Sequence, residues 1–347
     1  MSITSAAEYY FEQSEVNSTL PNSYETVLGR VRQSSRCVSR AGFHELSFQA
    51  MSTACRTDFV CKDARLAQEF RNRVINWIAW FEAQYSRFIP DSLIGRINAA
   101  AGLHWVAVDP ETDALFNLCQ DMIFLSRGVF DPTALPLMRL WNWKAKPPQI
   151  PTPEAVRAAR ELVGWRKIQR RKGTIFLPHE GMCLDLGGIG KEYAVDRVVM
   201  MALDAGITDV LVDFGQDVRV AGEPPERGAW HIGLDDPKNP GKCWTGVAVK
   251  DLAVATSGDY VRSFVADGRR YGHILDIRDG YPVNNGCLAV SVIAPHCTIA
   301  GILSTSAFVL GPKEGFDLIN ACVGAEGAVC TETGRHQTRN FYRYATS

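Results

Sequence analysis

Short runs of alternating apolar and polar residues constrain the fold of this chain more than any other sequence feature. Between residues 209 and 295 they read DVLVDFGQDVRVAGE, AWHIGLDDP, WTGVAVKDLAVATSGD, YGHILDIRDGYPV and CLAVSVIAP. Alternation with a period of two is typical of strands, and the Gly, Asp and Pro residues between the runs favour turns. Because strands and helices interleave without a regular βαβ rhythm, we predict an α+β fold with mainly antiparallel sheets and packed helices.

Helical periodicity predicts the helices that would cover these sheets. Gly128 suits the position just after one of them, and Thr152 with Pro153 suits the start of another. A further helix should end at Gly206, where the apolar pattern stops. The predicted helices span 63–87, 110–127, 153–162, 191–205 and 315–322. The apolar stretch AGILSTSAFVLG, 300–311, fits a core helix and also carries three hydroxyl side chains.

Composition narrows the classes of partner and the compartment. The 347 residues carry 37 Lys and Arg against 38 Asp and Glu, which argues against a nucleic-acid or membrane-surface partner. No window is apolar enough to span a membrane, and the N-terminal residues do not resemble a signal peptide. Ten cysteines without a CxxC pair favour a reducing compartment, so we expect a cytoplasmic protein. We predict a polar extension over residues 1–44 and one domain over 45–347.

The segment LDLGGIGKEYAVDR, 184–197, is the first candidate for chemistry. Its glycines would let a ligand approach the backbone, and the following helix N-terminus would favour an anion such as phosphate. It is not a Walker A loop, because Glu192 follows Gly190 and Lys191, and Tyr193 excludes a GxGxxG motif. From these residues alone, a phosphate site and a plain strand-to-helix turn both remain open.

Two other segments combine aromatic and polar side chains. In VFDPTALPLMRLWNW, 129–143, Phe130, Trp141 and Trp143 could line a pocket for a flat ring, although taken alone the segment fits a Pro-rich loop packed with aromatics better than a site. His273 stands beside Gly272 in YGHILDIRDG and follows the ATSGDY turn, and it is either accessible for chemistry or a structural histidine.

The order of nine blocks along the chain narrows these choices. They read FQAMST, SRFIPDSLIGRIN, GVFDPTALPLMRLW, LDLGGIGKEYAVDR, VDFGQDVRVAG, WHIGLDDP, VATSGDYVRSF, YGHILDIRDGYPV and AGILSTSAFVLG. Together, over about residues 45–345, they resemble the ApbE family, the FAD:protein FMN transferases. The resemblance implies the two-lobed ApbE-like fold with FAD held between the lobes. It also implies Mg²⁺-dependent transfer of FMN from FAD to a Thr or Ser of an acceptor flavoprotein, with release of AMP.

The resemblance also implies roles for individual residues. His273 would be the catalytic base, and the Gly188 carbonyl and the Thr305 hydroxyl would bind Mg²⁺. The residues that would contact FAD are Met51, Phe88, Val129, Phe130, Asp131, Asp185, Lys191 and Ile274. These types suit the chemistry, because phosphoryl displacement needs positioning, charge neutralisation by a hard cation, and a base that titrates near neutrality.

The chain departs from the family pattern where the metal is expected. The family's last block reads like ADALST and supplies an Asp to Mg²⁺, whereas this chain has AGILST, with Gly301 at that place. Thr305 stays on the same helix face. Glu192 and Gln216 each stand where the family has glycine. Since Mg²⁺ usually needs one or two carboxylates, we expect a weakened or altered site, and restoring the acid by Gly301→Asp should raise activity or lower the Mg²⁺ requirement.

Three functions therefore remain open from the sequence. The chain is a transferase whose metal has a substitute ligand such as Glu192 or Asp259, an FAD-binding paralogue without transferase activity, or a Mg²⁺-dependent FAD pyrophosphatase. Retention of His273 and Thr305 favours the transferase, because a protein that only binds FAD needs no base.

Overall fold

A nine-stranded sheet forms the framework of the computed structural model, which describes residues 20–142, 145, 149–239, 241–259, 263–266 and 268–346. The strand order is β1-β2-β3-β7-β8-β11-β16-β17-β18, and every neighbouring pair is antiparallel, which confirms the predicted α+β class. The bounds are β1 Arg36–Arg40, β2 Phe43–Ala50, β3 Thr53–Val60, β7 Val210–Phe214, β8 Asp217–Ala221, β11 Ala253–Gly258, β16 Cys287–Ala294, β17 Glu326–Thr331 and β18 Arg335–Gln337.

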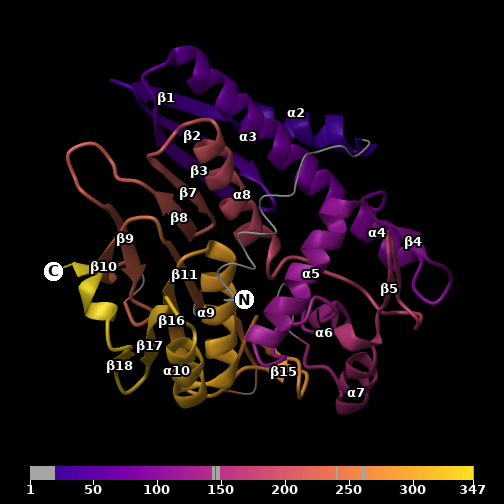
Figure 1. Cartoon of the computed structure of the whole chain (residues 1–347). Coiled ribbons are helices and arrows are strands. Elements are labelled where there is room, and N and C mark those ends of the chain that lie inside the picture. The colour runs from indigo at the N-terminus through magenta and orange to yellow at the C-terminus, as the bar shows by residue number, and fades with distance from the viewer. Residues whose placement is uncertain are drawn as a thin grey trace.

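Two lobes flank a pair of central helices (Figure 1). The large sheet forms one lobe, and the other contains α4, α5, α6, α7 and a small sheet of order β4-β6-β5. The central helices are α8, Gly190–Asp204, and α9, Cys297–Leu310. The second lobe has the bounds α4 Leu93–Ala99, α5 Pro110–Leu125, α6 Leu135–Leu140, α7 Pro153–Glu161, β4 Val106–Ala107, β5 Gln169–Arg171 and β6 Thr174–Phe176.

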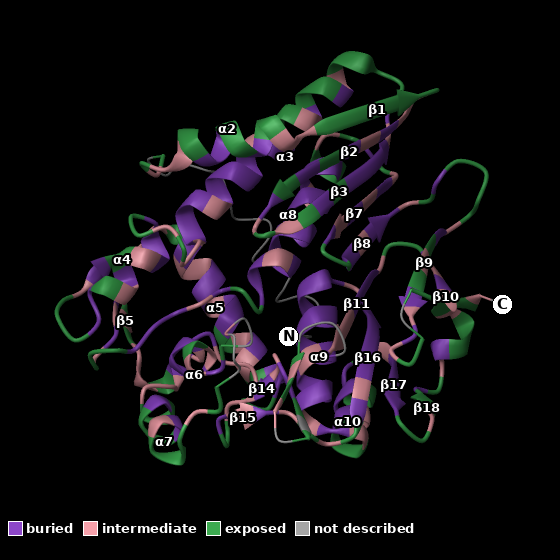
Figure 2. Ribbon diagram, turned by 180° about the vertical axis from the view of Figure 1, so that it is seen from behind, coloured by how far each residue is buried: buried purple, intermediate pink, exposed green. Residues whose placement is uncertain are grey.

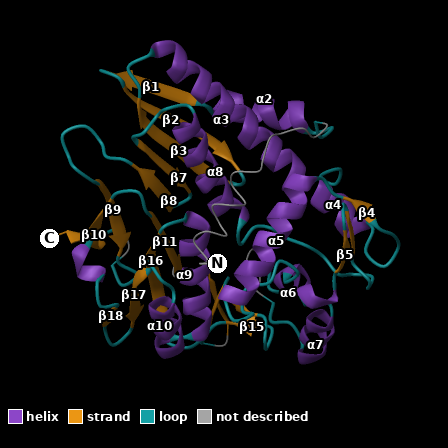
Figure 3. Cartoon of the chain, viewed as in Figure 1, coloured by secondary structure: helices purple, strands orange, loops and turns teal. Residues whose placement is uncertain are grey.

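Smaller elements complete the chain (Figure 3). A three-stranded sheet of order β19-β10-β9 packs beside the large sheet, and two short hairpins, β12–β13 and β14–β15, lie between β11 and β16 in the chain. The remaining bounds are α2 Tyr24–Ser34, α3 Ala64–Tyr85, α10 Pro312–Ala321, β9 Trp230–Asp235, β10 Cys243–Val249, β12 Ser263–Ala266, β13 Arg269–Gly272, β14 Leu275–Asp276, β15 Tyr281–Pro282 and β19 Ala345–Thr346, with single 3₁₀ turns at Trp165–Lys167 and Phe341–Arg343.

The alternation of side chains along β11 and β16 explains why both faces of the sheet are covered. Ala253 and Ala255 face the main core with α9, while Val254 between them faces a second core beneath β9 and β10. On β16, Val292 belongs to the main core and Ile293 to the second core in the same way. Because both faces of the sheet are covered, β16 is almost entirely buried. Helix α9, which packs against β11 and β16, is almost entirely buried as well (Figure 2).

Side-chain caps fix several helix starts close to their predicted positions. Asp63 accepts hydrogen bonds from the Arg65 and Leu66 backbone amides at 2.8 and 3.2 Å, and Thr152 accepts one from Ala155 N at 3.2 Å. The last predicted helix was placed too late: α10 begins at Pro312 rather than 315, because Pro occupies its first turn. The helix predicted over 110–127 ends at Leu125 with Ser126 as its C-cap, so Gly128 lies two residues further from its end than predicted.

Part of the predicted extension, residues 1–44, belongs to the same core as the rest of the chain. Residues 1–19 lie outside the described residues. From Leu20 onward, α2 packs against α3 through the buried Val27, Leu28 and Val31, and β1 pairs with β2 at the edge of the large sheet. Among the described helices, none combines the length and the apolar character that a membrane span requires.

Candidate functional site

A cavity of about 250 Å³ opens where the two lobes meet the start of α8. Its walls come from the β2–β3 turn, the end of α3 with the loop that follows, the loop before α8, and the β7–β8 turn. Four of the predicted FAD-contacting residues line it: Met51, Phe88, Asp185 and Lys191. The fold therefore brings together residues that come from three distant sequence blocks.

The β2–β3 turn forms part of one wall of this cavity. The β2–β3 turn consists of Met51 and Ser52, with φ of 49° and 61°, and such a two-residue turn normally contains Asn and Gly. Left-handed backbone at non-glycine residues is strained. The Met51 amide donates to Glu82 Oε2 at 2.8 Å, and Arg30 pairs with the other Glu82 oxygen at 2.6 Å, so α3 holds the strained turn in place.

The opposite wall carries an exposed aromatic ring beside an ion pair. Phe88 is 70% exposed, and the Arg87 guanidinium lies 4.2 Å from the centre of its ring. Arg87 Nε also contacts Asp185 Oδ2 at 3.0 Å, while Asp185 Oδ1 accepts a hydrogen bond from Gly187 N at 3.0 Å. The exposed ring can stack on a flat ligand, and the Asp185 contacts fix the loop that leads into α8.

Charged side chains at the start of α8 form the floor of the site. Lys191 Nζ pairs with Asp217 and lies 3.5 Å from Glu192 Oε1. Burial alone would lower the pKa of Lys191, but these two carboxylates raise it, so the ammonium stays protonated. Burial raises the pKa of Glu192 to about 7. Glu192 Oε2 is buried and has no hydrogen-bond partner among the described residues.

Glu192 fills the place of a missing side chain on α9. A Cβ built on Gly301 would lie 2.7 Å from Glu192 Cγ and 3.0 Å from Oε1, closer than ordinary van der Waals contact. One turn further along α9, Thr305 Oγ1 hydrogen-bonds Ser257 Oγ at 2.8 Å. The carboxylate from α8 and the hydroxyl from α9 are thus placed on the same side of the central helices.

The end of β11, which carries Ser257, lies close to the end of β13, which precedes His273. Asp259 comes two residues after Ser257, and its carboxylate pairs with Arg270 at 2.9 Å. A Cβ on Gly272 would lie 2.7 Å from Asp259 Cβ, so only glycine lets β13 run this close to Asp259. This contact places His273, the next residue, beside the turn. Tyr260 of the same turn lies outside the described residues.

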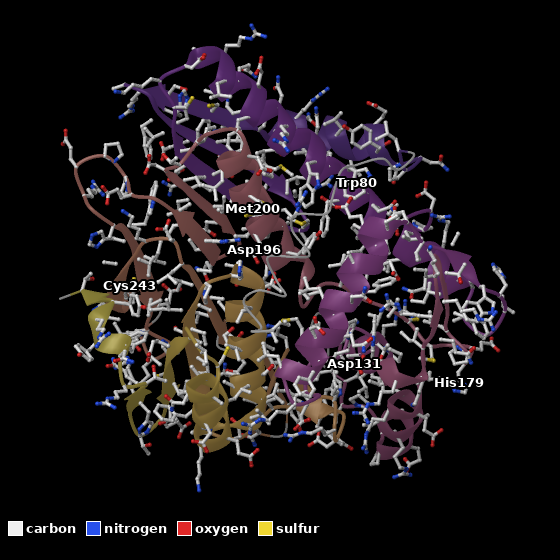
Figure 4. The ribbon with its side chains drawn as sticks, viewed as in Figure 1. Trp80, Asp131, His179, Asp196, Met200 and Cys243 are labelled. Atoms are coloured by element: carbon white, nitrogen blue, oxygen red, sulfur yellow. The ribbon has the colours of Figure 1, made fainter. Side chains whose placement is uncertain are left out.

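The remaining predicted residues surround the loop before α8. Phe130 faces Gly188, where a Cβ would lie 3.3 Å from the Phe130 ring. Both Asp131 oxygens accept hydrogen bonds from protein groups, including the Thr133 and Trp165 amides at 2.8 Å each, so this carboxylate orders its own loop (Figure 4). Val129 is buried, and Ile274 packs on the main core.

The two tryptophans predicted to line a pocket do not support that prediction. Trp141 is buried in a small separate core with Tyr271 and Leu275, and its indole N–H donates to the Gly280 carbonyl at 2.8 Å. It therefore holds the β14–β15 hairpin against α6 and α7 instead of facing a ligand. Trp143 lies outside the described residues.

Asp196 positions the site and was absent from the sequence prediction. This residue on α8 is completely buried and accepts hydrogen bonds from the Cys297 and Thr298 amides, at 2.8 and 2.9 Å, at the start of α9 (Figure 4). Arg219 on β8 pairs with it at 2.9 Å. Asp196 thereby fixes the alignment of α8 with α9, on which the Glu192–Gly301 contact depends. In the sequence it appears only as a second acid, one turn after Glu192 on the same helix face.

Comparisons with known proteins agree on one family. The model of the ApbE family matches residues 51–328. The FAD:protein FMN transferase of Treponema pallidum is 32% identical over 252 residues, which cover 68% of this chain and 70% of that protein. The one from Vibrio cholerae is 30% identical over 241 residues and covers 69% and 72%. Among solved structures, the ApbE protein from Thermotoga maritima has a TM-score of 0.79 and 30% identity, covering 88% of this chain and 100% of its own. The flavin transferase ApbE from Vibrio cholerae has a TM-score of 0.76 and 25% identity, covering 89% and 99%.

Proposed function

Because the chain belongs to the ApbE family, we propose that it is an FAD:protein FMN transferase. It would transfer FMN from FAD to a Thr or Ser of an acceptor flavoprotein and release AMP. The observation that carries this proposal is the convergence of Met51, Phe88, Asp185 and Lys191 on one cavity at the start of α8. The two relatives compared above, which carry the same activity in their names, each match more than two thirds of the chain.

Several features of this cavity suit part of an FAD molecule. The exposed Phe88 ring offers an aromatic face to a flat ring system. The N-terminus of α8 has no side-chain cap, and helix N-termini bind phosphate oxygens through their free amides. The protonated Lys191 adds a positive charge beside these amides. We propose that the cavity forms part of the FAD site.

The reaction at phosphorus requires charge neutralisation and a proton acceptor. Mg²⁺ would neutralise the pyrophosphate oxygens when bound. The buried Glu192 oxygen without a partner and the Thr305 hydroxyl are hard oxygen donors of the kind that Mg²⁺ prefers, and the Gly188 carbonyl would complete the set. His273 would accept the proton of the attacking hydroxyl, because imidazole titrates near neutral pH.

The proposed acceptor lies in the cytoplasm. All ten cysteines are free and eight of them are buried, which suits a reducing compartment. Buried thiols add small apolar side chains to the core without forming a disulfide framework.

Intact-mass spectrometry tests the proposed function. The protein is mixed with FAD, Mg²⁺ and flavoproteins of its source organism, one at a time. Transfer adds the mass of one FMN to an acceptor and releases one AMP. AMP with free FMN and unmodified acceptors would indicate an FAD pyrophosphatase, and unchanged FAD retained by the protein would indicate a binding protein. His273→Ala is the control, since it should stop transfer while FAD stays bound.

A further inference from the structure

Helix α9 has a notch at Gly301, and the side chain of Glu192 from α8 occupies it. A Cβ at position 301 would lie 2.7, 3.0 and 3.2 Å from the Cγ, Oε1 and Cδ atoms of Glu192. Real Cβ atoms do not approach other heavy atoms this closely, so every other residue type at 301 would displace the carboxylate. Gly301 is therefore the residue that lets Glu192 adopt its position.

One oxygen of the Glu192 carboxylate lacks the hydrogen bond that a buried acid needs. Glu192 is only 7% exposed, and its Oε2 atom has no hydrogen-bond partner among the described residues. Its closest cation, Lys191, lies 3.5 Å from Oε1 and makes its shorter contact with Asp217. A buried carboxylate oxygen without a partner is costly, and proteins usually pair such groups with a donor or a metal. A bound cation would supply the partner that this oxygen lacks.

Hydroxyl groups lie close to the notch along α9, and Ser304 Oγ donates a hydrogen bond to the Gly301 carbonyl at 3.0 Å. Thr305 follows Gly301 by one helical turn, so both positions share one face of α9. The Thr305 hydroxyl lies 2.8 Å from Ser257 Oγ, which also lies 2.9 Å from Ser304 Oγ. A carboxylate with neighbouring hydroxyls is a hard donor set, which favours Mg²⁺ or Mn²⁺ over softer metals.

We propose that Glu192 supplies the carboxylate ligand of a divalent cation that Thr305 also binds, and that Gly301 makes room for it. The acid that the family pattern places on α9 is thus provided by α8 in this chain. The role of the cation in FAD chemistry rests on the proposed function, whereas its binding does not.

Mn²⁺ titration of the full-length protein, followed by the electron paramagnetic resonance signal of free Mn²⁺, tests this assignment with and without FAD. Wild type should bind one Mn²⁺, and Glu192→Gln should weaken binding at least tenfold, because the amide keeps the shape and loses the charge. Glu111→Gln is the matched control: Glu111 also has a buried oxygen without a partner among the described residues, but it lies on α5, and its replacement should not change Mn²⁺ affinity. If Glu192→Gln does not fold, Glu192→Asp should weaken binding to an intermediate degree.

A double substitution tests whether a carboxylate on α9 can replace the one on α8. Glu192→Gly with Gly301→Asp moves the carboxylate back to α9 and should restore Mn²⁺ binding to within about threefold of wild type. Equal affinity of wild type and Glu192→Gln, or no Mn²⁺ binding by wild type, would overturn the assignment. If FMN transfer is insensitive to Glu192→Gln, the proposed function stands and the assignment of Glu192 as metal ligand fails. If Mn²⁺ binding depends on Glu192 but no transfer occurs, the assignment stands and the proposed function fails.

Discussion

The contact between α8 and α9 predicts that Gly301→Ala destabilises the protein, contrary to its usual effect in a helix. Replacing glycine by alanine inside a helix normally adds about 1 kcal/mol to the free energy of unfolding. Here the new methyl group would lie 2.7 Å from Glu192 Cγ, where both residues are buried. Overpacking of a buried site costs about 1–3 kcal/mol, so the overpacking cost outweighs the helix propensity. We expect Gly301→Ala to lower the free energy of unfolding by about 1 kcal/mol.

A second background isolates the steric cause. Glu192→Ala removes the Cγ and the carboxylate while keeping a good helix former on α8. In that background, Gly301→Ala should raise the free energy of unfolding by about 1 kcal/mol, so the sign reverses and the coupling energy is about 2 kcal/mol. Urea denaturation of the four proteins in EDTA, followed by circular dichroism, measures it without any metal. A coupling energy below about 0.5 kcal/mol would refute the contact.

Three further substitutions test other parts of the structure. Asp196→Ala should lower the free energy of unfolding in urea by about 3–5 kcal/mol, because it leaves Arg219 without its buried partner. Burial raises the pKa of Glu111 to about 7, so its stabilising protonated form is lost as pH rises through that value. Glu111→Gln should therefore stabilise the fold by about 2 kcal/mol at pH 8 and have little effect at pH 5; equal effects at both would contradict the shift. Thr152→Ala removes the α7 cap and should cost about 1 kcal/mol, measured by the same urea assay.

Local chemistry made most helices and strands predictable. Asp63 and Thr152 are strong N-cap residues, and both begin helices at the predicted places. The order of the strands was not predictable, because β3 pairs with β7 across several helices and no local pattern specifies that partner. Residues 20–44 were missed as structure because α2 buries only a narrow apolar stripe, formed by Val27, Leu28 and Val31.

The site was predictable in its residue types and less so in its contacts. The sequence blocks named Phe88, Asp185 and Lys191, and these residues do line one cavity. The sequence could not show that backbone amides occupy both oxygens of Asp131, since such hydrogen bonds depend on the path of a loop. The role of Asp196 was not predictable for a similar reason, because its partners are backbone amides of a helix that comes much later in the chain.

Gly301 shows most clearly what spatial contact adds to a sequence pattern. Along the chain, the resemblance to the family makes Gly301 and Glu192 two separate expected departures, a lost acid and a gained one. In space the two positions are in contact, because Glu192 requires the absence of a Cβ at 301. The sequence alone predicts that Gly301→Asp restores the metal site, but the structure predicts the opposite. Two carboxylates about 4 Å apart repel by roughly 4 kcal/mol at an effective dielectric constant near 20.

Gly301→Asp alone should therefore lower both the free energy of unfolding and the rate of FMN transfer. Adding Glu192→Gly should reverse both losses, because it removes the steric clash and the second charge together. Urea denaturation and the intact-mass assay measure the two quantities on wild type, Gly301→Asp, Glu192→Gly and the double variant. If Gly301→Asp alone were as stable as wild type and faster in transfer, the two positions would be independent, and Glu192 would not be the substitute for the missing acid.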